Sequence, residues 1–110
     1  MTDKILVFTT CGSPEEAAQI ARSLVESRLA ACVTVAPGMR SVYRWRGAIE
    51  ESEEWSLTIK SRRDLFAGLS TELRRLHSYE TPEILAIPVV EGAAAYLQWM
   101  EGELRTAADA

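Results

Sequence analysis

Two side chains in this 110-residue sequence could act on a metal ion, the thiol of Cys11 and the imidazole of His77, which is the only histidine. Cys11 lies between an expected strand end and an expected helix N-terminus, where the helix dipole favours a thiolate. A thiolate and an imidazole together suit copper or zinc. Glu83 follows in the same loop as His77 and could add an oxygen ligand. The sequence therefore predicts a copper or other divalent-cation site that a neighbouring chain or water must complete.

Two other interpretations of this pair stay open. Cys11 could be a nucleophile with His77 as its base, but such a pair needs a third, orienting group that the sequence does not identify. Both residues could also be structural, with Cys11 filling a strand-to-helix corner and His77 capping a helix C-terminus. We predict that the protein is not an enzyme and carries no organic cofactor.

The second cysteine, Cys32, is expected in the core, because free cysteines are among the most buried residues. We expect it to begin a strand that is a parallel neighbour of the strand ending at Cys11. The two thiols would then lie at opposite ends of the sheet, so we predict no disulfide between them.

A second candidate site is aromatic. We predict that five residues line a cleft between neighbouring chains: Tyr43, Trp45, Lys60, Tyr79 and Glu83. Aromatic walls with a few converging polar groups are typical of small-molecule pockets. Tyrosine and tryptophan are also enriched in protein interfaces, so packing between chains is the alternative interpretation.

A long β-hairpin over residues 31–60 must position these aromatic residues. Apolar residues alternate with polar ones on both sides of Arg46-Gly47, which we predict to be the turn. At ~3.3 Å per residue, strands of about fourteen residues make a ribbon of roughly 45 Å. A domain of this size has a radius of gyration of about 13 Å, so the ribbon should overhang it. Such an exposed edge invites pairing with another chain, and we predict a closed homo-oligomer.

The other elements flank this hairpin. We predict a first strand over Lys4–Thr10 and a helix that Ser13, Pro14 and Glu16 begin with a capping box and that ends near Arg28. The segment from Ser61 to Asp64 is expected to cap a second helix that continues to Leu76. A loop over residues 77–83 then leads to an edge strand over Ile84–Val90, since Pro88 cannot donate to a ladder.

The C-terminal part is predicted to form a third helix from Ala93 to about Leu104. Its inward residues should be Tyr96, Leu97, Met100 and Leu104, and the tail Thr106–Ala110 should be disordered. The chain is then a single domain, residues 1–110, ordered over about 3–105. The order β-α-β-β-α-β is that of an α+β, ferredoxin-like fold with an antiparallel sheet and two helices on one face. Trimeric association would cover the open face.

Composition narrows the class of protein. The net charge is −4 and no basic run occurs, which argues against nucleic-acid binding. The longest apolar runs are too short to span a membrane, and the N-terminus lacks the apolar stretch of a signal peptide. We therefore expect a cytoplasmic location without a membrane partner, and free thiols.

Four segments resemble the CutA divalent-cation tolerance family in order and spacing: Arg28-Leu-Ala-Ala-Cys-Val, Ser41-Val-Tyr-Arg-Trp-Arg-Gly-Ala-Ile-Glu, Leu76-His-Ser-Tyr-Glu-Thr-Pro-Glu-Ile and Tyr96-Leu-Gln-Trp. The resemblance covers Lys4 to about Glu103. It implies a ferredoxin-like homotrimer, similar in architecture to the PII signalling proteins, with ribbons woven between the chains.

The resemblance also implies copper binding, a role in divalent-cation tolerance and no established catalytic activity. Cys11 matches the loop cysteine proposed to bind copper in the family. The sequence departs from some members at Leu76-His77-Ser78-Tyr79, which offers one imidazole where those members read His-His-Pro-Tyr. The alternative function is that of a PII-like regulatory trimer, with a ligand cleft between chains and no direct metal role.

Overall fold

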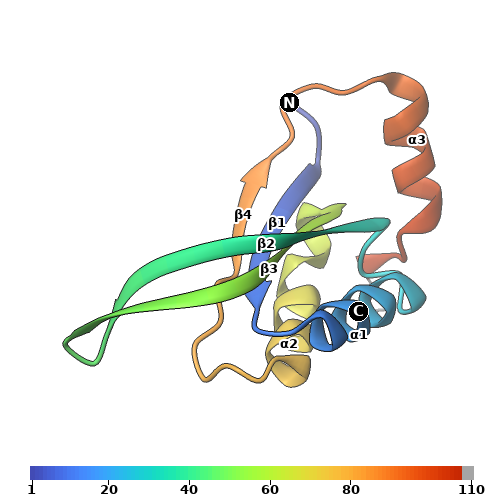
Figure 1. The fold of residues 1–110 in the computed structure, drawn as a ribbon. Coiled ribbons are helices and arrows are strands. Elements are labelled where there is room, and N and C mark those ends of the chain that lie inside the picture. The colour runs from blue at the N-terminus through green and yellow to red at the C-terminus, as the bar shows by residue number, and fades with distance from the viewer. Residues whose placement is uncertain (108–110) are drawn as a thin grey trace.

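The chain forms a four-stranded antiparallel sheet with two helices on one face and a third helix beyond its end (Figure 1). The computed structural model describes residues 1–107. The strands are β1 (Lys4–Cys11), β2 (Cys32–Trp45), β3 (Ala48–Arg62) and β4 (Leu85–Pro88). The helices are α1 (Pro14–Glu26), α2 (Phe66–Leu76) and α3 (Ala94–Glu103). The spatial order β2-β3-β1-β4 confirms the predicted ferredoxin-like arrangement.

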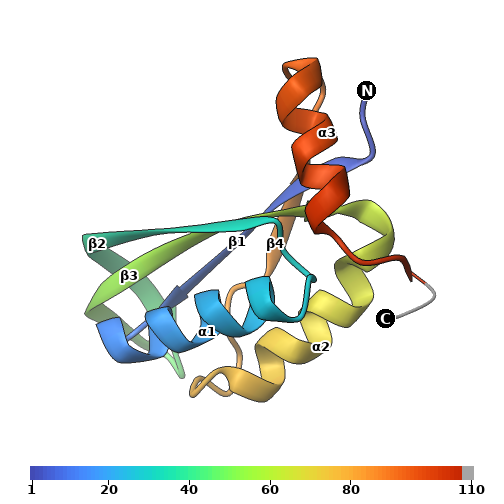
Figure 2. The ribbon, with the colours of Figure 1, turned by 90° about the vertical axis from the view of Figure 1, so that its right-hand side faces the viewer.

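The hydrophobic core lies between the sheet and the layer made by α1 and α2 (Figure 2). Fully buried apolar side chains come from one stripe of each helix and from alternate positions of the central strands: Ile20 and Leu24, Leu69 and Leu73, Val7, Leu57 and Ile59. Burying one such side chain contributes about 1.5–3 kcal/mol relative to leaving it in water. In the described chain, neither α1 nor α2 lies on the opposite face of the sheet, which contacts α3 only at its end, through Lys4, Lys60 and Arg62.

The start of α1 follows the prediction in part. The Ser13 side chain accepts a hydrogen bond from the Glu16 N–H over 3.1 Å, and Pro14 occupies the first helical position. The Glu16 carboxylate does not return to Ser13 but accepts hydrogen bonds from the Ser78 N–H and hydroxyl, at 2.9 and 2.8 Å. Glu16 therefore ties α1 to the loop after α2, a contact between segments that a local capping rule cannot foresee.

The predicted ribbon forms and projects beyond the helices (Figure 1). Arg46 and Gly47 make the turn with φ of 50° and 84°, the left-handed conformation of a two-residue hairpin loop. Pro37-Gly38 does not end the strand. It forms a bulge that adds one residue to β2 between the pairs Ala36↔Ser56 and Met39↔Glu54. The ribbon curves as it twists, and the whole molecule extends 44 Å along its longest axis.

The second helix begins later than predicted. Ser61 and Arg62 belong to β3, where the buried Ser61 hydroxyl donates to the Leu29 carbonyl over 2.7 Å. The carboxylate of Asp64 accepts from Arg62 Nε over 2.7 Å and makes no capping hydrogen bond. A 3₁₀ turn over Arg63–Leu65 leads into α2 without a side-chain cap. The predicted strand Ile84–Val90 was also too long, since β4 covers only Leu85–Pro88, although β4 does lie at the sheet edge. Beyond it, the Val89 N–H still donates to the Lys4 carbonyl over 2.9 Å.

Two further predictions about side chains were wrong. Cys32 is half-buried and not in the core, and its strand is not the neighbour of β1, because β3 lies between them. The thiols of Cys11 and Cys32 are nevertheless at opposite ends of the sheet, and both are free. Tyr96 is 41% exposed, and its hydroxyl accepts a hydrogen bond from Lys60 Nζ over 3.2 Å.

Buried cations attach the C-terminal segment to the sheet. Lys4 Nζ lies 2.9 Å and Arg62 Nη1 3.3 Å from the Glu101 carboxylate on α3. Arg62 Nη2 also donates to the Arg105 carbonyl over 2.6 Å, and the Arg105 N–H donates to the Arg28 carbonyl over 3.0 Å. The chain is thus held through Arg105. Residues 108–110 of the predicted disordered tail lie outside the described residues.

The hairpin turn gives a stability prediction. Gly47→Ala should lower the free energy of unfolding by about 1 kcal/mol, because a Cβ is strained at a φ of 84°. Gly102→Ala is the matched control: a Cβ there meets open space within α3, and alanine favours the helix by about 0.5–1 kcal/mol. Urea denaturation of both variants checks this. Equal changes of the same sign in the free energy of unfolding of the two variants would contradict this prediction.

Candidate functional site

His77 lies at the end of α2, against the end of β1, with its side chain fully buried. Its Nε2 is 2.7 Å from the Thr10 carbonyl oxygen, which can only accept, so Nε2 carries the hydrogen. Its Nδ1 accepts the Tyr79 N–H over 3.1 Å and is 3.3 Å from a Glu16 carboxylate oxygen. Both ring nitrogens are thus engaged within the chain, and the ring joins the loop to the sheet.

Cys11 is also fully buried, and its thiol donates to the Ser13 carbonyl with a sulfur-to-oxygen distance of 3.6 Å. Burial raises the pKa of the Cys11 thiol, and the carboxylates of Glu16 and Glu54 raise it further. This is the reverse of the predicted thiolate. The loss of water around the sulfur is the largest cause of this rise, and it outweighs the hydrogen bond to the Ser13 backbone, which lowers the pKa.

The predicted metal ligands Cys11, His77 and Glu83 are not gathered into one site. Glu83 is exposed on the loop after Tyr79, whereas the other two are buried. Among residues 1–107, no group of three histidine, cysteine, aspartate or glutamate side chains is placed to hold a metal ion. One chain alone therefore does not supply the expected coordination.

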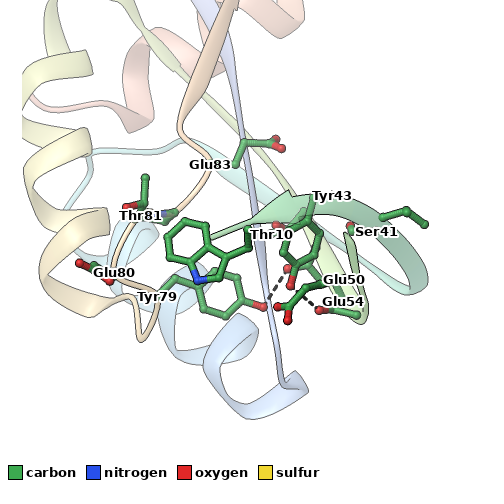
Figure 3. A pocket seen from close by; sticks show the side chains of 13 residues that line it. Thr10, Ser41, Tyr43, Glu50, Glu54, Tyr79, Glu80, Thr81 and Glu83 are labelled. Atoms are coloured by element: carbon green, nitrogen blue, oxygen red, sulfur yellow. Dashed lines mark hydrogen bonds between the residues drawn. The ribbon is translucent and has the colours of Figure 1, made fainter. Parts of the chain in front are cut away.

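A pocket of about 810 Å³ lies where the ribbon meets the loop from Tyr79 to Glu83. Figure 3 shows side chains of the ribbon and of the loop facing one another across it. Its lining includes four of the five predicted cleft residues: Tyr43, Trp45, Tyr79 and Glu83. Lys60 is not among them, because it pairs with Cys32 and Leu6 farther along the sheet. The placement of this pocket between chains stays a prediction.

Glu54 is the most buried of the pocket residues that the sequence did not reveal as a site. It is only 5% exposed, and one carboxylate oxygen accepts the Tyr79 hydroxyl over 2.8 Å. In the sequence, Glu54 belongs to a glutamate-rich stretch that opposes the arginines of β2, which is typical of a solvated hairpin face. Its burial arises because the Tyr79 ring folds over it. The alternation with Trp55 does place it on the sheet face opposite α1 and α2.

Tyr79 gives a pH prediction. Burial first, and then the hydrogen bond to the Glu54 carboxylate, hold the pKa of Tyr79 above its ordinary value. In an ultraviolet titration, Tyr79 should therefore ionise above a pH of about 10. A raised acid pKa means that the neutral phenol stabilises the fold below pH ~10 and that this stability is lost as the pH rises.

The control for this titration is Glu54→Gln, which keeps an acceptor for Tyr79 but removes the charge. Tyr79 should then ionise at a lower pH. An unchanged titration curve would show that Glu54 does not act on Tyr79.

Comparisons with known proteins agree with this fold. The family described as CutA1 divalent ion tolerance protein matches residues 5–103. The chain is 44% identical to the divalent-cation tolerance protein CutA of Thermus thermophilus over 86% of this chain and 92% of that protein. It is 41% identical to the human protein CutA over 93% of this chain and 57% of that protein. The names of these relatives carry no enzymatic role.

Solved structures are similar over almost the whole chain. The crystal structure of CutA from Xylella fastidiosa superposes with a TM-score of 0.92 at 42% identity, covering 94% of this chain and all of that one. A protein from Archaeoglobus fulgidus, described as a periplasmic divalent cation tolerance protein CutA, superposes with a TM-score of 0.90 at 37% identity, covering 93% and 99%. None of the helices in residues 1–107 has the length and apolar character needed to cross a membrane.

Proposed function

Because the chain belongs to the CutA1 divalent-ion tolerance family, we propose that it forms a cytoplasmic homotrimer that binds copper or another divalent metal ion and contributes to divalent-cation tolerance. The observation that carries this proposal is the match to the family over residues 5–103, nearly the full chain. The protein's partners are then two further copies of itself and metal ions.

The open face of the sheet supports the trimer. Leu85 and Ile87 on β4 are 62% and 47% exposed, and they pair with Phe8 and Leu6 of β1 on the face opposite α1 and α2. An exposed apolar patch of this kind marks an interaction surface. The ribbon adds Val42 and Ile49, at 63% and 61% exposed. Packing of three chains through this face, with ribbons crossing between them, removes these side chains from water.

The proposed ligands are Cys11, His77 and Glu83, with contributions from more than one chain. Glu83 is exposed and can reach an ion or a neighbouring chain. Cys11 must lose its proton, and His77 must give up the Tyr79 N–H at Nδ1. Both requirements cost binding free energy, so we expect modest affinity that increases with pH.

The experiment is an anaerobic titration of the reduced, metal-free protein with Cu(I), Cu(II) and Zn(II) at neutral pH. Saturable binding should weaken at least about tenfold in Cys11→Ser and Glu83→Gln, because each loses a ligand that carries charge when the metal is bound. Glu53→Gln is the matched control, since Glu53 is exposed and absent from the pocket lining. Equal binding by all four proteins would overturn the proposed site.

We also propose that the protein is not an enzyme. Within the described chain, the Cys11 thiol donates to Ser13 and the His77 Nε2 donates to Thr10, so neither hydrogen bond joins the thiol to the imidazole. A protonated, fully buried thiol is a poor nucleophile. A cysteine-directed probe should label Cys11 more slowly than a free peptide thiol.

The pocket favours a second candidate function, a PII-like trimer that senses a small molecule without a direct metal role. Its volume of about 810 Å³ is within the range of ligand sites, about 300–1,000 Å³. A small molecule that raises the melting temperature of the metal-free protein, with no effect in Trp45→Leu, would support this function. Trp99→Leu is the control, because Trp99 is similarly exposed but lies on α3.

A further inference from the structure

The pocket between the ribbon and the 79–83 loop has a strongly negative lining. In the described chain, its walls include four glutamates and no lysine, arginine or histidine: Glu50, Glu54, Glu80 and Glu83. Its hydroxyl groups and aromatic rings are neutral at physiological pH. The local field therefore attracts cations and repels anionic ligands such as nucleotides.

The Glu54 carboxylate lacks a counter-charge. It is 95% buried, and of its two oxygens only Oε2 takes part in the hydrogen bonds among residues 1–107. None of the ion pairs in that part of the chain includes Glu54. Buried charges in proteins are usually paired, since an unpaired one is costly. A cation bound in the pocket would complete this pairing.

The aromatic rings suit an organic cation. Tyr43, Trp45 and Tyr79 line the pocket, and an ammonium group over such a ring is stabilised by the negative ring face. The chain itself makes one such contact at the rim, where the Arg46 guanidinium lies 5.5 Å from the Trp45 ring centre. Arg46 also pairs with Glu80 over 3.3 Å, but both side chains are 73% exposed, so this pair is weak and leaves the pocket accessible.

The size and spacing of the charges argue for an extended ligand. The glutamates line a pocket of about 810 Å³ but are not gathered closely enough, within residues 1–107, for three of them to hold a metal ion. A ligand with several positive charges spaced along a flexible apolar chain would match these separate carboxylates and the aromatic surface between them. We propose that this pocket binds an aliphatic polyamine, with one ammonium group on Glu54. This inference rests on the second candidate function, a small-molecule trimer.

The experiment is isothermal titration of the full-length, metal-free protein with spermidine in the presence of a chelator. Saturable binding is expected, weakened about tenfold in Glu54→Gln by loss of the charge-assisted contact and several-fold in Trp45→Leu by loss of the ring. Glu53→Gln makes the same change of charge on the neighbouring residue outside the pocket and should stay within about twofold of the unmodified protein. The fold is preserved in Glu54→Gln, because glutamine can still accept the Tyr79 hydroxyl.

An uncharged chain of equal length, 1,8-octanediol, should not bind saturably. Equal effects of Glu54→Gln and Glu53→Gln on spermidine binding, or binding of octanediol as tight as that of spermidine, would overturn the proposal. If ATP binds instead and Trp45→Leu abolishes that binding, the polyamine proposal fails while the small-molecule function stands. If neither spermidine nor ATP binds, the polyamine proposal fails and the small-molecule function loses its support with it.

Discussion

Alanine at position 77 is expected to lower the free energy of unfolding by about 2–4 kcal/mol. The substitution removes a fully buried ring and leaves the Thr10 carbonyl and the Tyr79 N–H without their hydrogen-bond partner. The cavity and each of the two unsatisfied polar groups cost about 1–3 kcal/mol, and relaxation of the structure and entry of water offset part of this total. Urea denaturation at matched protein concentration measures the change.

Ser78→Ala is the control for this prediction. It removes an exposed hydroxyl and the hydrogen bond of that hydroxyl to Glu16, while the Ser78 N–H still donates to Glu16. The substitution should therefore lower the free energy of unfolding by less than about 1 kcal/mol. A His77→Ala variant as stable as the parent, but with lost metal binding, would contradict the structural role and identify His77 as a ligand. If His77→Ala is less stable but its folded form binds the metal ion as tightly as the parent does, His77 is not one of the proposed ligands.

The architecture could be predicted from local patterns. The alternation in residues 31–60, the Arg46-Gly47 turn and the stripe of Ala17, Ile20 and Leu24 each require knowledge of neighbouring residues only. The spacing of apolar residues identifies the side of a helix or strand that faces the core, and the same side is buried in the folded chain. Pro88 indicated the edge strand for the same reason, since a missing N–H restricts where a strand can lie.

The chemistry of the site could not be predicted in this way. Cys11 was expected to be a thiolate from its place at a helix N-terminus, but its pKa depends on burial by residues distant in sequence. Glu54 looked like a solvated charge until the loop carrying Tyr79 covered it. Lys60 has the right chemistry for a cleft, yet the register of β3 places it beside Tyr96 instead. Burial and register are set by the whole fold.

Lysine at position 87 is expected to convert the proposed trimer into a monomer. Ile87 is 47% exposed in the single chain and lies beside Leu6 on the sheet face opposite α1 and α2. In the proposed trimer this face would be buried, and a lysine ammonium there would be desolvated without a partner, at a cost of several kcal/mol per chain. Light scattering coupled to size exclusion should show a mass change from three chains of 12.2 kDa to one.

Val25→Lys is the control for surface charge, because Val25 is similarly exposed, at 42%, but lies on α1 away from the open face. A cation in the last turn of a helix also agrees with the helix dipole, so the substitution should not unfold the chain. Dissociation in Ile87→Lys alone would show that three copies meet through the open face. A trimer that survives Ile87→Lys would instead place the contacts on the ribbon, where Val42 and Ile49 are exposed apolar residues. Light scattering coupled to size exclusion on Ile49→Lys would then test the ribbon interface separately from the open face.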